Sequence, residues 1–350
     1  MMSNKNTITF EEPFITENGA SIPQPTIAYR SWGDLNEARD NVVVVCHALT
    51  GNADADEWFN GLLGPGKTLD PTNQFIICPN VLGSCYGTTG PTSINPETGT
   101  PYRANFPKIT IRDMVRLQQQ LVDALEITGI ELLIGGSMGG MQVLEWTIMD
   151  DRPQAAVLIG MGKAHRPWAI GISHTQRQAI YNDPNWNKGY YSEEHPPKKG
   201  LALARMIAMI SYRSDTDYEH KFARLQEADS DEFQVESYLD YQGQKLVERF
   251  DAVSYVRLTQ AMDSHDVARN RSSYVEVLGD IDIPVLVIGI NSDLLYPVRE
   301  QHELAQLLPK GRYRRIRSTH GHDAFLIEFD QLNKIIKPFL IETPTRIVHY

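Results

Sequence analysis

Five short runs of apolar, mostly β-branched residues divide the chain at wide intervals. Each run is apolar throughout instead of alternating with polar residues, which is typical of strands buried on both faces of a parallel sheet. The runs are Val42–Cys46, Phe75–Cys78, Leu132–Ile134, Ala156–Ile159 and Val285–Ile290. Since parallel strands need long crossover connections, this spacing predicts an α/β fold around one doubly wound sheet.

An amphipathic helix is expected between the second and third runs. Thr110 is a candidate N-cap with Asp113 three residues further on, and the apolar residues that follow recur at helical spacing. These apolar residues are Ile111, Met114, Val115, Val122 and Leu125. Strand, helix and strand in this order is the pattern of a doubly wound fold.

The series of strand-like runs stops after about Lys163 and resumes at Ile283. The segment between them is charged, tyrosine-rich and helical in pattern, with an apolar helix expected over Leu201–Tyr212 behind a proline-rich linker. We therefore expect one sheet domain formed by residues 1–163 and 276–350. A helical cap over residues 164–275 would be inserted between its two parts.

Four glycines surround a single serine in the stretch Leu133–Gln142. Its centre, Gly135–Gly139, fits the pattern G-x-S-x-G between an expected strand and a helix expected over Gly140–Trp146. Small residues on either side of the serine let the flanking backbones pass closely, and the helix N-terminus offers free N–H groups to a developing oxyanion. This context predicts a nucleophile elbow at Ser137, with a glycine-rich turn without chemistry as the alternative.

An elbow serine needs an acid and a base that come later in the chain. Functional side chains gather on loops at the carboxyl ends of parallel strands. Asp293 follows the run Val285–Ile290 and is the candidate acid. Asp280 and Asp282 precede that run and would lie at the opposite edge of the sheet.

Two histidines follow the next expected strand, Tyr313–Ile316. His322 comes after a glycine and before a helix expected over Ala324–Phe329, so it can reach back over the sheet and is the candidate base. His320 is the alternative, with the simpler role of a loop histidine bonded to the backbone. No further ligands follow at matching spacing, so the sequence predicts no metal site.

The loop His47–Gly51 follows the first buried run, where this architecture supplies an oxyanion-hole N–H group. Leu49 is the candidate donor, paired with the N–H group of Met138. His47 begins this loop, and the alternative to a part in the active site is that it only caps the end of the strand.

Arg205 lies within the expected apolar helix, and Tyr212 follows seven residues later on the same helix face. A guanidinium among apolar residues is costly unless it is paired, and a carboxylate satisfies it best. That carboxylate belongs either to a substrate or to the protein itself.

Charge and cysteine content restrict the partners. The net charge of −11 argues against binding to nucleic acid or to anionic membranes. Residues 1–10 are polar, and no run approaches the roughly 18 apolar residues that would span a bilayer. Cys46, Cys78 and Cys85 form no CxxC pair, which fits a reducing compartment. We therefore expect a cytoplasmic protein.

Longer motifs resemble the homoserine O-acetyltransferase family, whose members are acyltransferases with an α/β-hydrolase fold. The motifs are His47–Gly51, Gly87–Pro91, Gly135–Gln142 and Gly321–Leu326, within a resemblance that extends from about Ile27 to Glu328. The resemblance implies a catalytic triad of Ser137, Asp293 and His322, in agreement with the topological argument.

The resemblance also implies how a substrate is held. Arg205 and Tyr212 would recognise the carboxylate of the amino acid. Asp323, beside the candidate base, would hold its ammonium group, and Thr50 would lie near its hydroxyl.

By the same resemblance, an acetyl group would pass from acetyl-CoA to the hydroxyl of L-homoserine by a ping-pong mechanism, in methionine biosynthesis. The family implies a cytoplasmic homodimer, with acetyl-CoA as co-substrate and no permanently bound cofactor. The segment Gly87–Thr92 is more similar to acetyl-transferring than to succinyl-transferring relatives. The alternatives are a homoserine O-succinyltransferase, a serine O-acetyltransferase, a carboxylesterase-type hydrolase, and a non-catalytic binding protein of the same fold.

Overall fold

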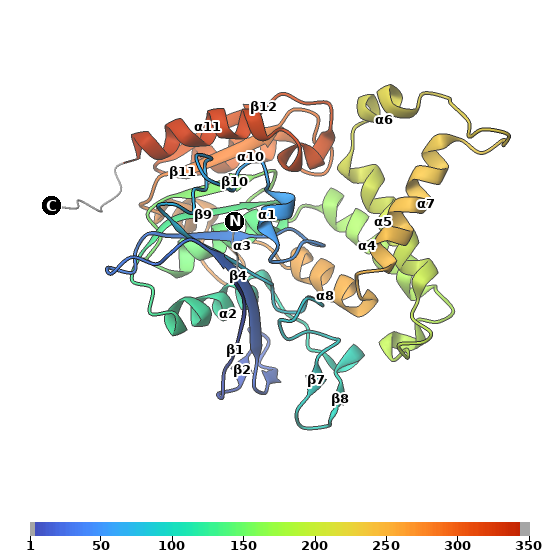
Figure 1. Cartoon of the computed structure of the whole chain (residues 1–350), viewed down its shortest axis with the longest axis horizontal. Coiled ribbons are helices and arrows are strands. Elements are labelled where there is room, and N and C mark those ends of the chain that lie inside the picture. Colours follow the sequence, from blue (N-terminus) through green and yellow to red (C-terminus); the bar gives the residue numbers. More distant parts are fainter. Residues whose placement is uncertain (1–3, 344–350) are drawn as a thin grey trace.

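The computed structural model describes residues 4–343, in which one eight-stranded sheet forms the centre of the molecule (Figure 1). In spatial order its strands are β1 (Asn4–Thr9), β4 (Thr26–Trp32), β6 (Phe75–Pro79), β5 (Val42–Cys46), β9 (Ile130–Gly136), β10 (Ala156–Ile159), β11 (Val285–Ile290) and β12 (Gly311–Ile316). β4 runs antiparallel to both of its neighbours, and every later pair is parallel. The sheet is therefore mostly parallel, as predicted.

All five apolar runs are strands of this sheet. β5, β10 and β11 have the predicted bounds, whereas β6 and β9 extend beyond the predicted residues. The strand expected over Tyr313–Ile316 is β12, which begins two residues earlier, at Gly311.

Successive residues of β5 enter two separate apolar clusters, one on each face of the sheet. Val42 and Val44 pack in a cluster with α2 (Ile111–Ala124) and α3 (Met138–Met149). Val43 and Val45 pack in a second cluster with α11 (Phe329–Glu342). Figure 1 shows α11 on one side of the sheet and α2 and α3 on the other. Burial on both faces explains why the strand is apolar without alternation.

Helix α2 begins at the predicted N-cap. The Asp113 N–H group donates to Oγ1 of Thr110, and the Thr110 N–H group donates at 3.0 Å to Oδ2 of Asp113. This capping box satisfies N–H groups that the first helical turn leaves without partners. Helix α3 begins at Met138, two residues before the predicted Gly140.

The chain between β10 and β11 forms helices. They are α4 (Pro167–Tyr181), α5 (Lys198–Tyr212), α6 (Asp215–Phe222), α7 (Gln234–Val247), α8 (Ala252–Asp263) and α9 (Tyr274–Gly279). α5 packs against α4 and α7, and these helices stand together beyond one end of the sheet (Figure 1). Ala164 pairs with Asp266 in an isolated antiparallel bridge, so the two ends of this stretch meet.

Shorter elements complete the part of the chain that the structure describes. They are α1 (Ala55–Trp58), α10 (Val298–Leu307), the strand pairs β2 (Phe14–Ile15) with β3 (Ser21–Ile22) and β7 (Ile94–Asn95) with β8 (Thr100–Pro101), and the 3₁₀ helices η1 (Arg103–Asn105), η2 (Asn187–Gly189) and η3 (Gly321–Leu326). None of the helices in residues 4–343 has the length and apolarity needed to cross a membrane.

The helix expected over Ala324–Phe329 is present with different bounds. The chain forms the 3₁₀ helix η3 from Gly321 to Leu326, and α11 begins at Phe329. The Ile327 N–H group donates to the carbonyl of Ala324, three residues back, which is the bonding of a tight 3₁₀ turn.

Candidate active site

Ser137 lies at the turn between β9 and α3, with backbone angles φ 54° and ψ −127°. A positive φ on a residue with a side chain costs about 1–3 kcal/mol and persists only where the surroundings hold it. Here the Ser137 N–H group donates at 2.9 Å to the carbonyl of Ile159, and its own carbonyl accepts at 3.1 Å from the N–H group of Met141. The strand on one side and the helix on the other thus fix the bend predicted for a nucleophile elbow.

The glycines beside the serine allow two backbones to approach. A Cβ atom on Gly139 would lie 2.1 Å from the carbonyl oxygen of Cys46, at the end of β5. A Cβ atom on Gly135 would lie 2.5 Å from the carbonyl oxygen of Gly139. Any side chain at either position would displace the turn or the neighbouring strand.

The candidate acid and base are hydrogen-bonded to each other. Nδ1 of His322 donates at 2.7 Å to Oδ2 of Asp293. The other carboxylate oxygen of Asp293 accepts at 2.8 Å from each of the N–H groups of Leu295 and Tyr296. Both side chains are almost fully buried, so the carboxylate is held in one orientation and directs Nε2 of His322 away from itself.

The environment of His322 is compatible with the role of base predicted for it. Burial alone would lower the pKa of the imidazole, but the charge and hydrogen bond of Asp293 outweigh it and raise the pKa above its usual value. Nε2 is buried and has no hydrogen-bond partner in residues 4–343. The rings of Tyr212, Tyr296 and Phe325 lie 5.8, 5.3 and 5.5 Å from the imidazole centroid and fix its plane.

A cavity of about 510 Å³ brings most of the predicted site residues together. Ser137 and His322 line it, as do five further candidates, namely Leu49, Thr50, Arg205, Tyr212 and Asp323. Asp293 lies behind His322 and does not line the cavity, and neither does the buried side chain of Met138. The predicted nucleophile and base therefore share one chamber with residues from the segment between β10 and β11.

The two candidate oxyanion donors are free to bind a ligand. Within residues 4–343 the N–H groups of Leu49 and Met138 have no protein acceptor. Gln142 joins the two segments, because its Nε2 donates at 3.1 Å to the carbonyls of both His47 and Met138. This buried amide was missed in the sequence, although a glutamine in the apolar face of an elbow helix was a signal for it.

His47 stabilises the end of β5. Its Nε2 accepts at 3.1 Å from the N–H group of Val81, so the proton lies on Nδ1, which donates at 2.9 Å to the carbonyl of Ala48. Burial lowers the pKa of this imidazole to about 4, and the neutral ring can therefore keep both bonds at neutral pH. His47 therefore caps the end of the strand, which was the alternative considered for it. Its two hydrogen bonds also hold the loop that carries Leu49.

Arg205 extends from α5 into the cavity. Its guanidinium lies 5.7 Å from the ring centroid of Tyr212, and among residues 4–343 no carboxylate approaches within ion-pair distance. Burial raises the pKa of the Tyr212 phenol to about 12, so that hydroxyl is a donor at neutral pH. The protein therefore leaves a guanidinium in the wall of the cavity without a carboxylate of its own.

Asp323 lines the cavity beside His322, and Nε of Arg213 lies 3.2 Å from its Oδ2. Burial raises the pKa of this carboxyl, while the charges of Arg213 and Arg205 oppose that change. Arg213 was missed in the sequence because it follows the end of α5, outside any motif.

The second histidine, His320, has a different partner. Its Nδ1 lies 2.6 Å from Oδ1 of Asp217 in α6, and Ser214 donates a hydrogen bond to the carbonyl of Thr319 beside it. A Cβ atom on Gly321, whose φ is +65°, would lie 2.6 Å from the carbonyl carbon of Arg213. The loop that carries His322 thus rests directly on the chain between α5 and α6.

Thr50 lines the cavity, and its carbonyl is bound by Arg249. Nη1 of Arg249 donates to that carbonyl at 2.8 Å and to the hydroxyl of Tyr86 at 2.6 Å. Arg249 and Lys245 also line the cavity and were not singled out from the sequence.

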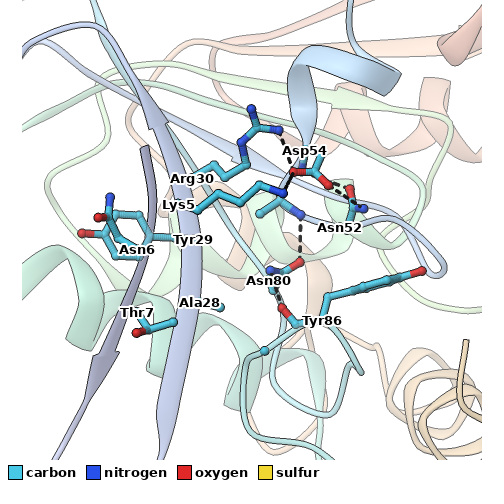
Figure 2. Close-up of a pocket in the computed structure, with 12 residues that line it drawn as sticks. Lys5, Asn6, Thr7, Ala28, Tyr29, Arg30, Asn52, Asp54, Asn80 and Tyr86 are labelled. Atoms are coloured by element: carbon cyan, nitrogen blue, oxygen red, sulfur yellow. Dashed lines mark hydrogen bonds and ion pairs between the residues drawn. The ribbon is translucent and has the colours of Figure 1, made fainter. Parts of the chain in front are cut away.

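A second cavity of about 450 Å³ lies beside the first, and Asn52 lines both (Figure 2). Its two cations are paired within the protein: Nη1 of Arg30 lies 2.6 Å from Oδ1 of Asp54, and Nζ of Lys5 lies 3.4 Å from the same oxygen (Figure 2). Gly87, at the start of the segment that favoured acetyl transfer, lines this second cavity and not the first.

Comparisons with known proteins place this arrangement in a family. The family model described as alpha/beta hydrolase fold matches residues 41–329. A curated relative from Chloroherpeton thalassium, named homoserine O-acetyltransferase, is 54% identical over 336 residues, which is 96% of this chain and 89% of the relative.

Solved structures are similar over nearly the whole chain. The crystal structure of homoserine O-acetyltransferase from Bacillus anthracis superposes with a TM-score of 0.91 at 29% identity and covers 99% of each chain. The structure of esterase E22 has a TM-score of 0.89 at 25% identity and covers 97% of this chain and 100% of its own. The chain therefore belongs to the alpha/beta hydrolase fold family and, within it, to the acyltransferase family of the homoserine O-acetyltransferases.

Proposed function

We propose that this protein transfers the acetyl group of acetyl-CoA to the hydroxyl of L-homoserine through an acyl-serine intermediate, as a step of methionine biosynthesis. One observation carries the proposal. The chamber that contains Ser137 and the unpartnered Nε2 of His322 also contains the guanidinium of Arg205, which has no protein carboxylate within ion-pair distance in residues 4–343. A hydrolase for neutral esters has no use for that cation, whereas an amino-acid acceptor supplies the carboxylate it lacks.

In the first half-reaction, Oγ of Ser137 attacks the thioester carbonyl while Nε2 of His322 accepts its proton. Asp293 stabilises the imidazolium that forms. The N–H groups of Leu49 and Met138 donate to the oxyanion of the tetrahedral intermediate, which is commonly worth about 3–4 kcal/mol of barrier per donor. The carbon–sulfur bond then breaks, and His322 returns the proton to the departing thiolate of CoA.

In the second half-reaction, His322 accepts the proton of the homoserine hydroxyl as that oxygen attacks the acetyl-serine ester. The ester bond to Ser137 breaks, and Oγ recovers the proton from His322, which leaves O-acetyl-homoserine. Arg205 and Tyr212 would hold the carboxylate of the acceptor, and Asp323 its ammonium group, with Thr50 near its hydroxyl. These contacts fix the attacking oxygen near the ester and favour it over water.

The segment 164–275 would act as a cap over a core of residues 1–163 and 276–350. Two facts support this division: Ala164 and Asp266 pair at the ends of the segment, and its residues Arg205 and Tyr212 line the chamber of Ser137. The family resemblance further implies a homodimer in the cytoplasm, with no permanently bound cofactor. Light scattering and cell fractionation test the first two of these properties.

Thiol release from acetyl-CoA, measured with and without homoserine, tests the proposed function. We expect homoserine to accelerate thiol release and O-acetyl-homoserine to accumulate in the same amount. Equal thiol release without homoserine would identify a hydrolase of the kind represented by esterase E22. Competition between acetyl-CoA and succinyl-CoA, and between homoserine and serine, identifies the preferred donor and acceptor.

Arg205→Leu tests the observation that carries the proposal. Removing one partner of a buried charge pair costs about 2–5 kcal/mol, and the partly buried Arg205 belongs at the lower end of this range, so kcat/KM for homoserine should fall by about thirtyfold. Acylation by acetyl-CoA alone should stay near the wild-type rate. With homoserinol, an acceptor without a carboxylate, the variant and the wild type should be equally slow, and a large difference would contradict the assigned role.

A further inference from the structure

We propose that Lys245 and Arg249 form a binding site for the phosphate groups of a coenzyme A thioester at the mouth of the catalytic cavity. This site rests on the proposed function, because it concerns the acyl donor of that reaction. CoA carries its thioester on a long pantetheine arm and its phosphates at the far end. A donor with its carbonyl at Ser137 therefore needs cations at the opening of the cavity and not beside the nucleophile.

The two residues lie on one face of the chain. Lys245 is in the last turn of α7, and Arg249 follows four residues later, where the N–H group of Arg249 still donates to the carbonyl of Leu246 at 3.0 Å. Residues four apart in a helical turn are neighbours on its surface. Both side chains are exposed and both line the cavity of Ser137.

Neither cation is neutralised by the protein. Within residues 4–343 no carboxylate lies within ion-pair distance of Lys245 or Arg249, although the chain as a whole has a net charge of −11. The neighbouring cavity differs in this respect, because both of its cations are paired with Asp54 (Figure 2). The cavity that contains the predicted nucleophile therefore offers cations that can bind an anionic ligand.

Arg249 is also positioned in advance. Its Nη1 donates to the carbonyl of Thr50 and to the hydroxyl of Tyr86, while Nη2 and Nε have no bond to residues 4–343 and can face a ligand. A guanidinium held in this way loses little conformational entropy when it binds a phosphate, and its planar fork suits phosphate oxygens. Lys245, whose Nζ lies 5.9 Å from the ring centroid of Tyr241, adds a mobile second charge.

The carboxylates that line the cavity do not neutralise Lys245 and Arg249. Among the lining residues, the carboxylates are those of Glu57 and Asp323. Asp323 is paired with Arg213, and Arg205 is assigned to the acceptor. This leaves two cations against the single carboxylate of Glu57, so the opening attracts polyanions in preference to neutral esters.

Steady-state kinetics of the double variant Lys245→Gln/Arg249→Gln test this site with two donors. One donor is acetyl-CoA, and the other is S-acetyl-N-acetylcysteamine, a neutral thioester that lacks the phosphates. We expect KM for acetyl-CoA to rise about tenfold, since each exposed charged contact contributes up to about fivefold to affinity. KM for the neutral donor and for homoserine should stay within about twofold of wild type. Arg249→Lys keeps the charge but loses the planar fork, so its KM for acetyl-CoA should lie between those of the wild type and the double variant.

Lys334→Gln is the matched control, because it removes one exposed lysine charge on α11, away from the cavity. High salt should raise KM for acetyl-CoA in the wild type and in this control, but only weakly in the double variant. An unchanged KM for acetyl-CoA in the double variant, or an equal rise for both donors, would overturn the phosphate site. Failure of the wild type to acetylate homoserine from either donor would instead overturn the proposed function.

Discussion

The guanidinium of Arg213 lies 3.2 Å from the carboxylate of Asp323, which stands beside His322 in the wall of the catalytic cavity. Burial raises the pKa of this carboxyl, and Arg213 is the largest of the influences that lower it. Arg213 therefore favours the ionised form of Asp323, at the place proposed for the ammonium group of the acceptor.

Removing this partner should weaken acceptor binding. In Arg213→Gln the pKa of Asp323 should rise, so that less of the carboxylate is ionised and KM for homoserine increases by about tenfold. The increase should be greatest at low pH, while KM for acetyl-CoA should not change. Arg224→Gln, which removes an exposed charge beside α6, is the control. A parallel rise in both KM values would show that Arg213 only supports the fold of the cap.

Replacing the carboxylate behind the histidine should abolish most turnover. In Asp293→Asn the amide oxygen can keep the bonds from the N–H groups of Leu295 and Tyr296, which directs the NH₂ group toward Nδ1 of His322. Nδ1 must then accept, so the imidazole takes the tautomer that cannot accept a proton at Nε2. We expect kcat to fall by about 10⁴, as in the equivalent change in a serine protease, with little change in the melting temperature. A near-normal kcat would remove Asp293 from the triad.

The pH dependence of acylation should report His322. Because Asp293 raises the pKa of this imidazole above its usual value of about 6.5, the neutral form that acts as base is lost as pH falls through a midpoint above 6.5. In Asp293→Asn, burial is no longer opposed, so the midpoint of the residual activity should move below 6.5. Thiol release from acetyl-CoA between pH 5 and 9 measures both midpoints. Identical acid limbs in the two proteins would contradict the assignment.

A methyl group at the elbow should destabilise the fold. In Gly139→Ala the new Cβ would lie 2.1 Å from the Cys46 carbonyl oxygen, and overpacking of this kind costs roughly 1–3 kcal/mol or more. Gly171→Ala is the matched control, because Gly171 lies inside α4 with nothing within 4 Å of its Cβ position. There alanine should stabilise the helix by about 1 kcal/mol. Chemical denaturation of the two variants should give changes of opposite sign, and equal changes would contradict the close approach.

The sheet and the positions of its loops follow from local sequence, because strands buried on both faces have a recognisable composition. Ser137 and Asp293 follow such strands, β9 and β11, whereas His322 comes after the partly exposed edge strand β12. All three strands are parallel, so topology brings the three residues to one edge of the sheet. Strand β4 was missed because it contains Arg30, whose charge is satisfied by Asp54. That ion pair joins residues from two separate segments of the chain, so no local sequence pattern predicts it.

The polar residues that line the cavity were also hard to predict, because they come together only through contacts between separate segments. Arg205 was found because a cation in an apolar helix is conspicuous. Lys245 lies in the last turn of α7 and Arg249 just beyond its end, among ordinary charged residues. Only the packing of α7 beside α5 brings them to the cavity that contains Ser137. Similarly, no motif predicts that Asp217 would bind His320.

The close approach of Gly321 to the end of α5 has a consequence for how this protein can evolve. One helix carries Arg205 and ends against the loop that holds His322. With the roles proposed for Arg205 and His322, a mutation that shifts α5 to admit a longer or shorter amino acid would also displace the imidazole from the serine. Substrate specificity and turnover would then be coupled through this helix, and a change of specificity would require compensating changes in the loop that carries His322.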